Sequence, residues 1–323
     1  MTLRLTALVI AMTILLSGCA LNEPRGDVFT SDDTQVYTES EFTSEPDMTE
    51  IAEETSDVTE NAESDVTEEE LTPIYDTSAI LEAYRNGDPS PLSEMDRAIY
   101  DAALEAVAEF YHDSMSESEI VIAAHDWIVT NITYDTAMLL AIPEKTPETE
   151  NPYGALILRE GICMGYTTTF QLFMDMLGIE SQIVRGTATD GSVWEEHAWN
   201  LVNIGGEYYH VDTTWDDFVP DEPDRQAFHM YLLVPDYVMA PLHRWDKDAT
   251  PKATAEDLIY YKTHGLYTDS KHGSSLILDA AFADGQSYCE IMTPTEREVS
   301  YSHVLQYWPI DFTNYTVTIY WMK

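Results

Sequence analysis

Three residues of the kinds that perform nucleophilic catalysis lie in separate parts of the chain: Cys163, His197 and Asp212. Cys163 begins a segment whose apolar residues recur at helical spacing as far as Leu177, and Gly178 then supplies a stop. The sequence therefore predicts a helix that starts at or beside Cys163. The unpaired N–H groups and the dipole at such a helix start favour a thiolate, which is a nucleophile.

The histidine and the aspartate lie on two predicted strands joined by a tight turn. Segments 196–204 and 207–215 are rich in β-branched and aromatic residues, and Gly205-Gly206 between them favours a two-residue hairpin. In that register Asp212 is a diagonal neighbour of His197 on one face of the sheet. Diagonal partners lie about 7–8 Å apart, within reach of a hydrogen bond, whereas a one-residue bulge would separate the two side chains.

These three residues together could carry out acyl transfer. A cysteine nucleophile needs a base for its proton, and the base needs a partner that fixes its tautomer. Cys163, His197 and Asp212 fill these roles in that order. The expected chemistry is attack on an amide carbonyl, a thioester intermediate, and transfer of the acyl group to an amine or to water. A lone cysteine is more often a small buried residue, which is how we interpret Cys289.

The segments around these residues resemble the three core motifs of the transglutaminase-like superfamily, whose fold is related to papain. They are Gly161-Ile162-Cys163-Met164-Gly165-Tyr166, His197-Ala198-Trp199-Asn200 and His210-Val211-Asp212-Thr213-Thr214-Trp215-Asp216. The likeness covers 117–217, although Met164 and Thr167 differ from residues common in bacterial relatives. It implies an α+β core in which the nucleophile helix packs on an antiparallel sheet, with Cys163 as nucleophile, His197 as base and Asp212 as orienting acid. The resemblance also implies an oxyanion site made by the Cys163 backbone N–H and an upstream side chain, for which Tyr134 is the candidate.

Other residues near the motifs have two explanations each. Tyr166, Trp199 and Trp215 either line a substrate groove or belong to the core. We expect Asp216-Asp217 to be a solvated strand end rather than a calcium site, and His125 and His210 to be structural. Nothing resembles the calcium sites of the animal cross-linking enzymes, so we expect no metal and no cofactor.

The first 73 residues differ in composition from the rest of the 323-residue chain. Residues 1–19 have the pattern of a secretory signal, and the apolar run is too short for an ordinary membrane-spanning helix. Its ending, Leu16-Ser17-Gly18-Cys19, resembles a bacterial lipobox and implies a lipid on Cys19; the alternative is a signal peptide with a chance cysteine. Residues 20–73 are rich in Asp, Glu, Ser and Thr, which predicts a disordered acidic tether.

The remaining chain is expected to hold a catalytic domain at 74–248 and a small α+β subdomain at 249–323. Capping signals predict helices after Ser93 and from 117 to about 131, and segment 228–234 has the composition of a buried strand. Residues 315–321 alternate with period two, which is typical of a strand.

Charge and cysteine content narrow the function. A formal net charge of −44 argues against nucleic acid as a partner. We expect Cys163 and Cys289 to remain free thiols, since a bridge would silence the nucleophile. The sequence thus predicts an exported enzyme, anchored through Cys19 on the extracytoplasmic face of the membrane, that acts as an acyltransferase or hydrolase on protein or peptide amides, those of the cell envelope included. The alternatives are a peptidase or amidase that uses water, and a non-catalytic peptide- or glycan-binding module.

Overall fold

The computed structural model describes residues 73–136, 147–217, 227–295 and 301–322. The predicted signal peptide with Cys19, and the predicted tether up to residue 72, lie outside the described residues. No helix within the described ranges is both long enough and apolar enough to cross a membrane.

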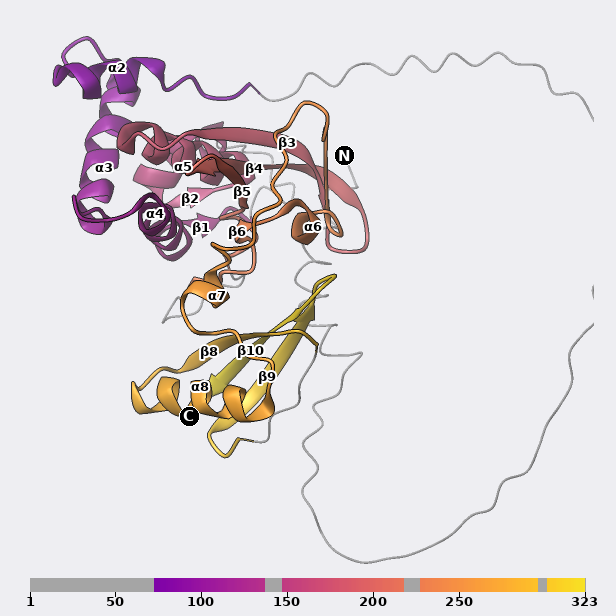
Figure 1. Ribbon diagram of the computed structural model, residues 1–323. Helices are drawn as coiled ribbons and strands as arrows, with labels where there is room; N and C mark the ends of the chain where they lie inside the picture. Colours follow the sequence, from indigo (N-terminus) through magenta and orange to yellow (C-terminus); the bar gives the residue numbers. More distant parts are fainter. Residues whose placement is uncertain (1–72, 137–146, 218–226, 296–300, 323) are drawn as a thin grey trace, which may run out of the picture. The chain divides into compact units, whose positions relative to one another are not determined.

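Three helices precede the cysteine motif (Figure 1): α2 (Ser78–Asn86), α3 (Glu94–Phe110) and α4 (Glu117–Asn131). Ser93 caps α3 by accepting a hydrogen bond from the Asp96 N–H, and Ser116 with Glu119 forms a complete capping box at α4. Both predicted helices are therefore confirmed. Their apolar faces pack together in one core cluster that also includes buried residues of the next long helix.

That next helix is α5 (Cys163–Leu177), which begins at Cys163 and ends before Gly178 in the left-handed conformation, as predicted. A short parallel pair, β1 (Thr133–Tyr134) and β2 (Glu160–Gly161), leads into it, together with η1 (Pro147–Glu150) and η2 (Gly154–Leu158). The Ile162 N–H donates to the Thr149 carbonyl at 2.9 Å, which fixes the start of the helix.

A five-stranded antiparallel sheet, in the order β6-β5-β4-β3-β7, carries the other motifs. Its strands are β3 (Ser181–Thr189), β4 (Trp194–Ile204), β5 (Glu207–Val211), β6 (Leu232–Val234) and β7 (His243–Trp245). Ile204 pairs with Glu207, so the predicted hairpin register is confirmed. Gly205 and Gly206 form the turn with φ of 63° and 93°, a left-handed conformation that favours glycine.

Two predicted strands are shorter than expected. The strand predicted for 207–215 ends at Val211, because the Asp212 carboxylate accepts the backbone N–H groups of Thr214 and Trp215 and turns the chain. Only Leu232–Val234 of the predicted segment 228–234 is a strand. The backbone before it bonds instead to Asp216, whose carboxylate accepts the Tyr231 N–H at 3.0 Å.

The C-terminal part contains a three-stranded antiparallel sheet in the order β8-β10-β9. Its strands are β8 (Tyr288–Thr293), β9 (Val304–Asp311) and β10 (Thr316–Met322); helices α6 (Asp236–Met239), α7 (Tyr260–Thr263) and α8 (Lys271–Ala283) precede them. The strand predicted at 315–321 is confirmed as β10, whereas β9 was not predicted. Cys289 is buried beside α8, and neither Cys163 nor Cys289 forms a disulfide, as expected.

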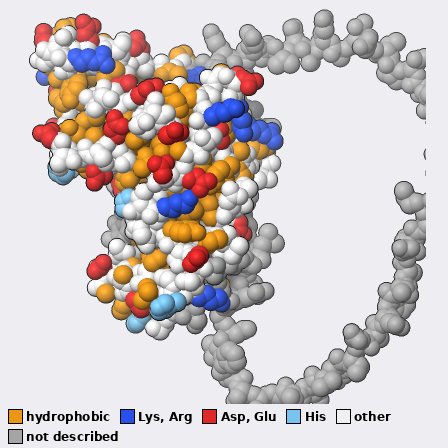
Figure 2. Space-filling view, in the orientation of Figure 1, with side chains coloured by type: hydrophobic (Ala, Val, Ile, Leu, Met, Phe, Trp, Pro, Cys, Tyr) orange, Lys and Arg blue, Asp and Glu red, His pale blue; other side chains and the backbone are white. Residues whose placement is uncertain are grey.

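The acidic residues are distributed unevenly between surface and interior. Figure 2 shows acidic side chains spread over the visible face, with the basic side chains in small separate groups. Asp216 and Asp217, however, are 0% and 7% exposed, so the expectation of a solvated strand end is wrong. The turn at Asp212 directs both side chains inward, where Asp216 meets His125 and Asp217 accepts the Tyr166 hydroxyl.

Candidate active site

His197 and Asp212 form a close buried pair. His197 lies in β4, Asp212 follows β5, and the His197 Nε2 is 2.7 Å from the Asp212 Oδ2. The second carboxylate oxygen, Oδ1, accepts the N–H groups of Thr214 and Trp215 at 3.1 and 3.2 Å. The aspartate therefore has a fixed orientation, and it fixes the imidazole in turn.

Electrostatics make this pair ionic. Burial by itself would lower the pKa of His197, but the charge and hydrogen bond of Asp212, followed by a hydrogen bond with Cys163, raise that pKa to about 10. Burial by itself would raise the pKa of Asp212, yet His197 and then His243 hold it well below its usual range. At neutral pH, His197 is thus an imidazolium beside a carboxylate.

Cys163 reaches this pair from the start of α5. Its side chain is half-buried and forms the hydrogen bond with His197 noted above. Two bonds hold α5 against β4: the Thr167 Oγ1 donates to the Ala198 carbonyl at 2.9 Å, and the Asn200 Nδ2 donates to the Thr167 carbonyl at 3.2 Å. The structure therefore brings the cysteine, the histidine and the aspartate together, and Thr167, which departs from the family pattern, helps to hold them.

A second histidine shares the aspartate. His243, in β7, places its Nε2 3.1 Å from the Asp212 Oδ2, and its ring centroid is 5.5 Å from that of His197. Burial is the main reason that the pKa of His243 is lowered, so this ring is neutral and donates a hydrogen bond. Sequence alone did not identify this contact, because His243 lies in a three-residue strand outside the three motifs.

Tyr134, the candidate for the second oxyanion donor, lies close to the cysteine. It pairs with Gly161 across the short β1-β2 ladder, two residues before Cys163. Burial, followed by the charge of Cys163, raises the pKa of Tyr134. Its hydroxyl therefore stays protonated and keeps a proton to donate.

The three aromatic groove candidates separate into two kinds. Tyr166 and Trp199 are 0% and 1% exposed, which favours the alternative that they belong to the core. The Tyr166 hydroxyl donates to the Ile132 carbonyl at 3.0 Å, and the Trp199 Nε1 donates to the His210 Nδ1 at 2.9 Å. Trp215 is only partly buried, with its ring 6.0 Å from that of His197 and 4.6 Å from that of His243. It is thus the one of the three that keeps exposed surface beside the histidine pair.

The described elements form a mixed helix-and-sheet fold that brings a cysteine, a histidine and an aspartate together. Residues 105–213 match the family model of the Transglutaminase-like superfamily. This stretch, which contains Cys163, His197 and Asp212, is a transglutaminase-like domain. The match extends over only part of the chain.

Relatives resemble the same region. The kyphoscoliosis peptidase of Homo sapiens is 29% identical over 119 residues, which are 34% of this chain and 18% of the human protein. Its Mus musculus counterpart is 27% identical over 135 residues, 39% of this chain and 20% of the mouse protein. The matched regions thus span about a fifth of the length of these relatives. A crystal structure described as a TGase is 18% identical to this chain, with a TM-score of 0.32. The match covers 45% of this chain and 39% of the TGase chain.

Proposed function

We propose that this protein is a cysteine enzyme that acts on protein or peptide amides through a thioester at Cys163. One observation carries the proposal: a half-buried thiol at a helix start is hydrogen-bonded to an imidazole, and that imidazole is bonded to a buried carboxylate. Each of the three groups meets a separate requirement of nucleophilic catalysis, and no single group would be sufficient for the reaction.

In the proposed reaction, the Cys163 sulfur attacks the amide carbonyl carbon and forms a C–S bond. The tetrahedral intermediate collapses with cleavage of the C–N bond, and the His197 imidazolium gives its proton to the departing amine. Water or a second amine then attacks the thioester, loses a proton to His197, and releases the thiolate. Asp212 bonds to the His197 Nε2, which leaves the Nδ1 for the sulfur and for proton transfer.

The developing oxyanion needs donors, and the start of α5 supplies one. The N–H groups in the first turn of a helix have no intrahelical acceptor, and Ile162 provides no side-chain cap there. We propose that the Cys163 backbone N–H and the Tyr134 hydroxyl bind the oxyanion. The raised pKa of Tyr134 supports this role, because the hydroxyl must keep its proton in order to donate it.

The acyl acceptor decides between transfer to an amine and hydrolysis. The human and mouse relatives are named peptidases, and a peptidase transfers the acyl group to water. Their names therefore support water as an acceptor, and an amine stays the alternative. Incubating the purified protein with a glutamine-containing protein and a labelled amine separates the two routes. Incorporation of the label indicates transfer, whereas released peptide fragments or free carboxylate indicate hydrolysis.

The test of the cysteine uses its buried counterpart as a control. We expect Cys163→Ala to lower activity by orders of magnitude and Cys289→Ser to preserve it, because Cys289 is 4% exposed within β8. Iodoacetamide should label the parent at Cys163 and leave the Cys163→Ala protein unlabelled. Equal activity of the parent and Cys163→Ala would refute the assignment. An inert Cys163 with no activity on any amide would favour a binding module.

We further propose that the enzyme is exported and held at the extracytoplasmic face of the membrane by lipid on Cys19. The Leu16-Ser17-Gly18-Cys19 sequence supports this location. A clickable fatty acid fed to the producing cells should label the parent and not Cys19→Ser. Equal labelling of both proteins would rule the anchor out.

A further inference from the structure

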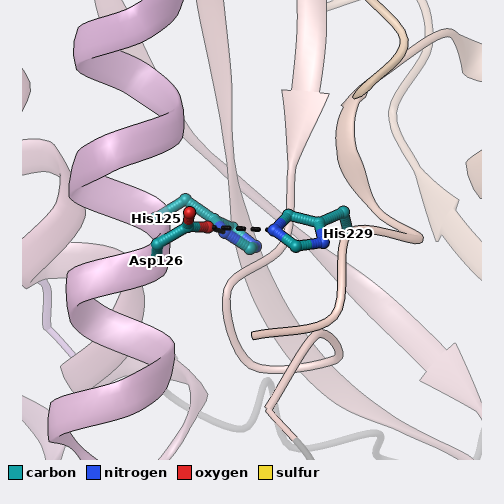
Figure 3. A group of neighbouring side chains, drawn as sticks. All are labelled: His125, Asp126 and His229. Atoms are coloured by element: carbon teal, nitrogen blue, oxygen red, sulfur yellow. Dashed lines mark hydrogen bonds and ion pairs between the residues drawn. The ribbon is translucent and has the colours of Figure 1, made fainter. Parts of the chain in front are cut away.

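A second group of histidines and carboxylates lies outside the proposed triad. Helix α4 contributes His125 and Asp126, and the segment before β6 contributes His229 (Figure 3). The Asp126 Oδ1 is 2.9 Å from the His125 Nδ1 and 3.2 Å from the His229 Nε2. One ligand atom from each residue lies within 4.8 Å of the other two. Two imidazoles and a carboxylate therefore converge on a single point.

In each histidine, the ring nitrogen that faces away from Asp126 contacts another buried carboxylate. The His125 Nε2 lies 3.1 Å from the Asp216 Oδ2, and the His229 Nδ1 lies 2.7 Å from the Glu290 Oε2. Metal-binding histidines usually donate their second ring N–H to a carboxylate in this way, which turns the lone pair of the other nitrogen toward the ion. Both histidines of the group have this arrangement.

The bonding of His229 is incomplete on the side that faces the group. Its Nε2 is buried and lies 3.2 Å from the Asp126 Oδ1, in an ion-pair contact that falls short of a well-formed hydrogen bond. The His229 ring is 6% exposed and stacks on Tyr260 with a centroid distance of 3.7 Å. Because Tyr260 and Glu290 fix the ring, the nitrogen cannot turn away to find another partner.

The charges around the group also favour a cation. Asp126, Asp216 and Glu290 converge on only two imidazoles, and Asp216 and Glu290 are buried. Without a metal ion, positive charge on the two imidazoles pairs with these carboxylates. Imidazoles bind a metal ion in their neutral form, and the three negative charges then need a cation in place of the two protons. A divalent ion would offset two of the three negative charges.

We propose that His125, Asp126 and His229 bind a divalent transition-metal ion of the zinc type. Zinc takes imidazole nitrogen and carboxylate oxygen at about 2.0–2.2 Å, which places tetrahedral ligand atoms about 3.3–3.5 Å apart. The separations of 2.9 and 3.2 Å require small adjustments to reach that spacing. The Asp126 side chain is 40% exposed, so a water molecule can take the fourth position.

The ion would connect α4 to the segment before β6 and, through Glu290, to β8. This inference does not depend on the proposed chemistry of Cys163. It changes our expectation of no metal, which rested on sequence alone. His229 follows Asp126 by more than a hundred positions, and no ligand spacing in the sequence joins them.

The test is zinc titration of the chelator-treated full chain by calorimetry, in a Cys163→Ala background that removes thiolate binding near His197. We expect one zinc per chain. His229→Ala should weaken binding at least 100-fold, and Glu290→Gln should weaken it about 10- to 100-fold, because it perturbs only the outer partner. His264→Ala is the matched control: His264 stacks on the same Tyr260 ring at 4.1 Å but is exposed and outside the group, so its loss should leave affinity unchanged.

A second measurement identifies the ligands. Cobalt(II) in place of zinc should give visible bands of nitrogen and oxygen coordination without a sulfur charge-transfer band, in the parent as well as in Cys163→Ala. Should His229→Ala fail to fold by circular dichroism, Asp126→Asn replaces it, because that side chain is partly exposed. The proposal is overturned if the chain binds no zinc, if binding is the same in these variants, or if it requires Cys163.

Discussion

Asp212 accepts four hydrogen bonds, which occupies all the positions that a carboxylate offers. His197 and His243 both donate to the Oδ2, and the N–H groups of Thr214 and Trp215 donate to the Oδ1. An asparagine at this position would turn its NH₂ group, which cannot accept a hydrogen bond, toward either the two histidines or the two backbone N–H groups. The aspartate is therefore a fixed anion whose role is to orient His197 and to stabilise its positive charge.

This arrangement predicts a graded effect of substitutions around the aspartate. Asp212→Asn should lower kcat by about 10²- to 10⁴-fold, because the His197 tautomer loses its support, though by less than Cys163→Ala. His243→Phe should lower kcat only about tenfold, since it removes one of four donors and costs about 1.4 kcal/mol of barrier. Steady-state kinetics on one peptide substrate checks both. If His243→Phe were as damaging as Asp212→Asn, His243 would have a direct role in the chemistry.

The ionic state of His197 predicts the pH profile. Because its pKa is raised to about 10 from an ordinary value near 6.5, the ring keeps its proton throughout the neutral range. The proton that the leaving amine needs is lost only as the pH rises through the raised value. We therefore expect kcat/KM to stay high above pH 7 and to fall near pH 10. An alkaline decline centred near pH 6.5 would show that the Asp212 pair does not raise the pKa.

At the scale of elements, the start of α5 depends on a close backbone approach. A Cβ on Gly165 would collide with the Thr149 carbonyl oxygen, so any side chain there must displace the first turn that carries Cys163. The other end of the helix is different. Gly178 has φ of 78°, and a Cβ added to it would meet nothing within 4 Å, so alanine there suffers only backbone strain.

These two glycines make a matched pair of predictions. Gly165→Ala should cost about 1–3 kcal/mol from overpacking and should also lower activity at least tenfold by moving the thiol. Gly178→Ala should cost a similar amount, about 1–2 kcal/mol, through its left-handed backbone, with kcat unchanged. Urea unfolding measures the first quantity and peptide turnover the second. Unaltered kcat in Gly165→Ala would mean that the helix start tolerates displacement.

Sequence predicted the elements whose signals are local. The caps at Ser93 and Ser116, the stop at Gly178 and the glycine turn each lie within a few residues of the structure they specify. Strand β7 was not predicted, because three residues are too few for a periodic pattern, and it exists because it pairs with β3. Strand β6 is the last part of the strand predicted at 228–234, and it pairs with β5. The end of β5 and the late start of β6 were not predicted, because they depend on hydrogen bonds from backbone N–H groups to the Asp212 and Asp216 carboxylates. The sequence does not show these partners.

At the scale of the whole molecule, what escaped prediction is the set of buried ion pairs between distant segments. His197, in β4, and Asp212, directly after β5, lie 15 positions apart on one hairpin, so their juxtaposition could be predicted from the turn. His125 and Asp216 are separated by 91 positions, and His229 and Glu290 by 61. No local pattern marks such pairs, and an isolated acidic residue is typical of a solvated surface. Only the complete fold identifies the buried carboxylates.

Glu290 shows how much such a pair contributes. Its Oε2 accepts from the His229 Nδ1 at 2.7 Å, its Oε1 accepts from the Tyr261 hydroxyl at 3.0 Å, and the side chain is almost fully buried. Removing one partner of a buried pair leaves the other uncompensated, which costs about 3–5 kcal/mol. We expect Glu290→Ala to lose this amount in urea unfolding with a chelator present, so that metal plays no part. Glu256→Ala, which breaks the exposed pair with Lys262, should lose less than about 1 kcal/mol. Equal losses would mean that His229 and Tyr261 find water or other partners when Glu290 is gone, and that β8 is not held to the rest of the fold by charge.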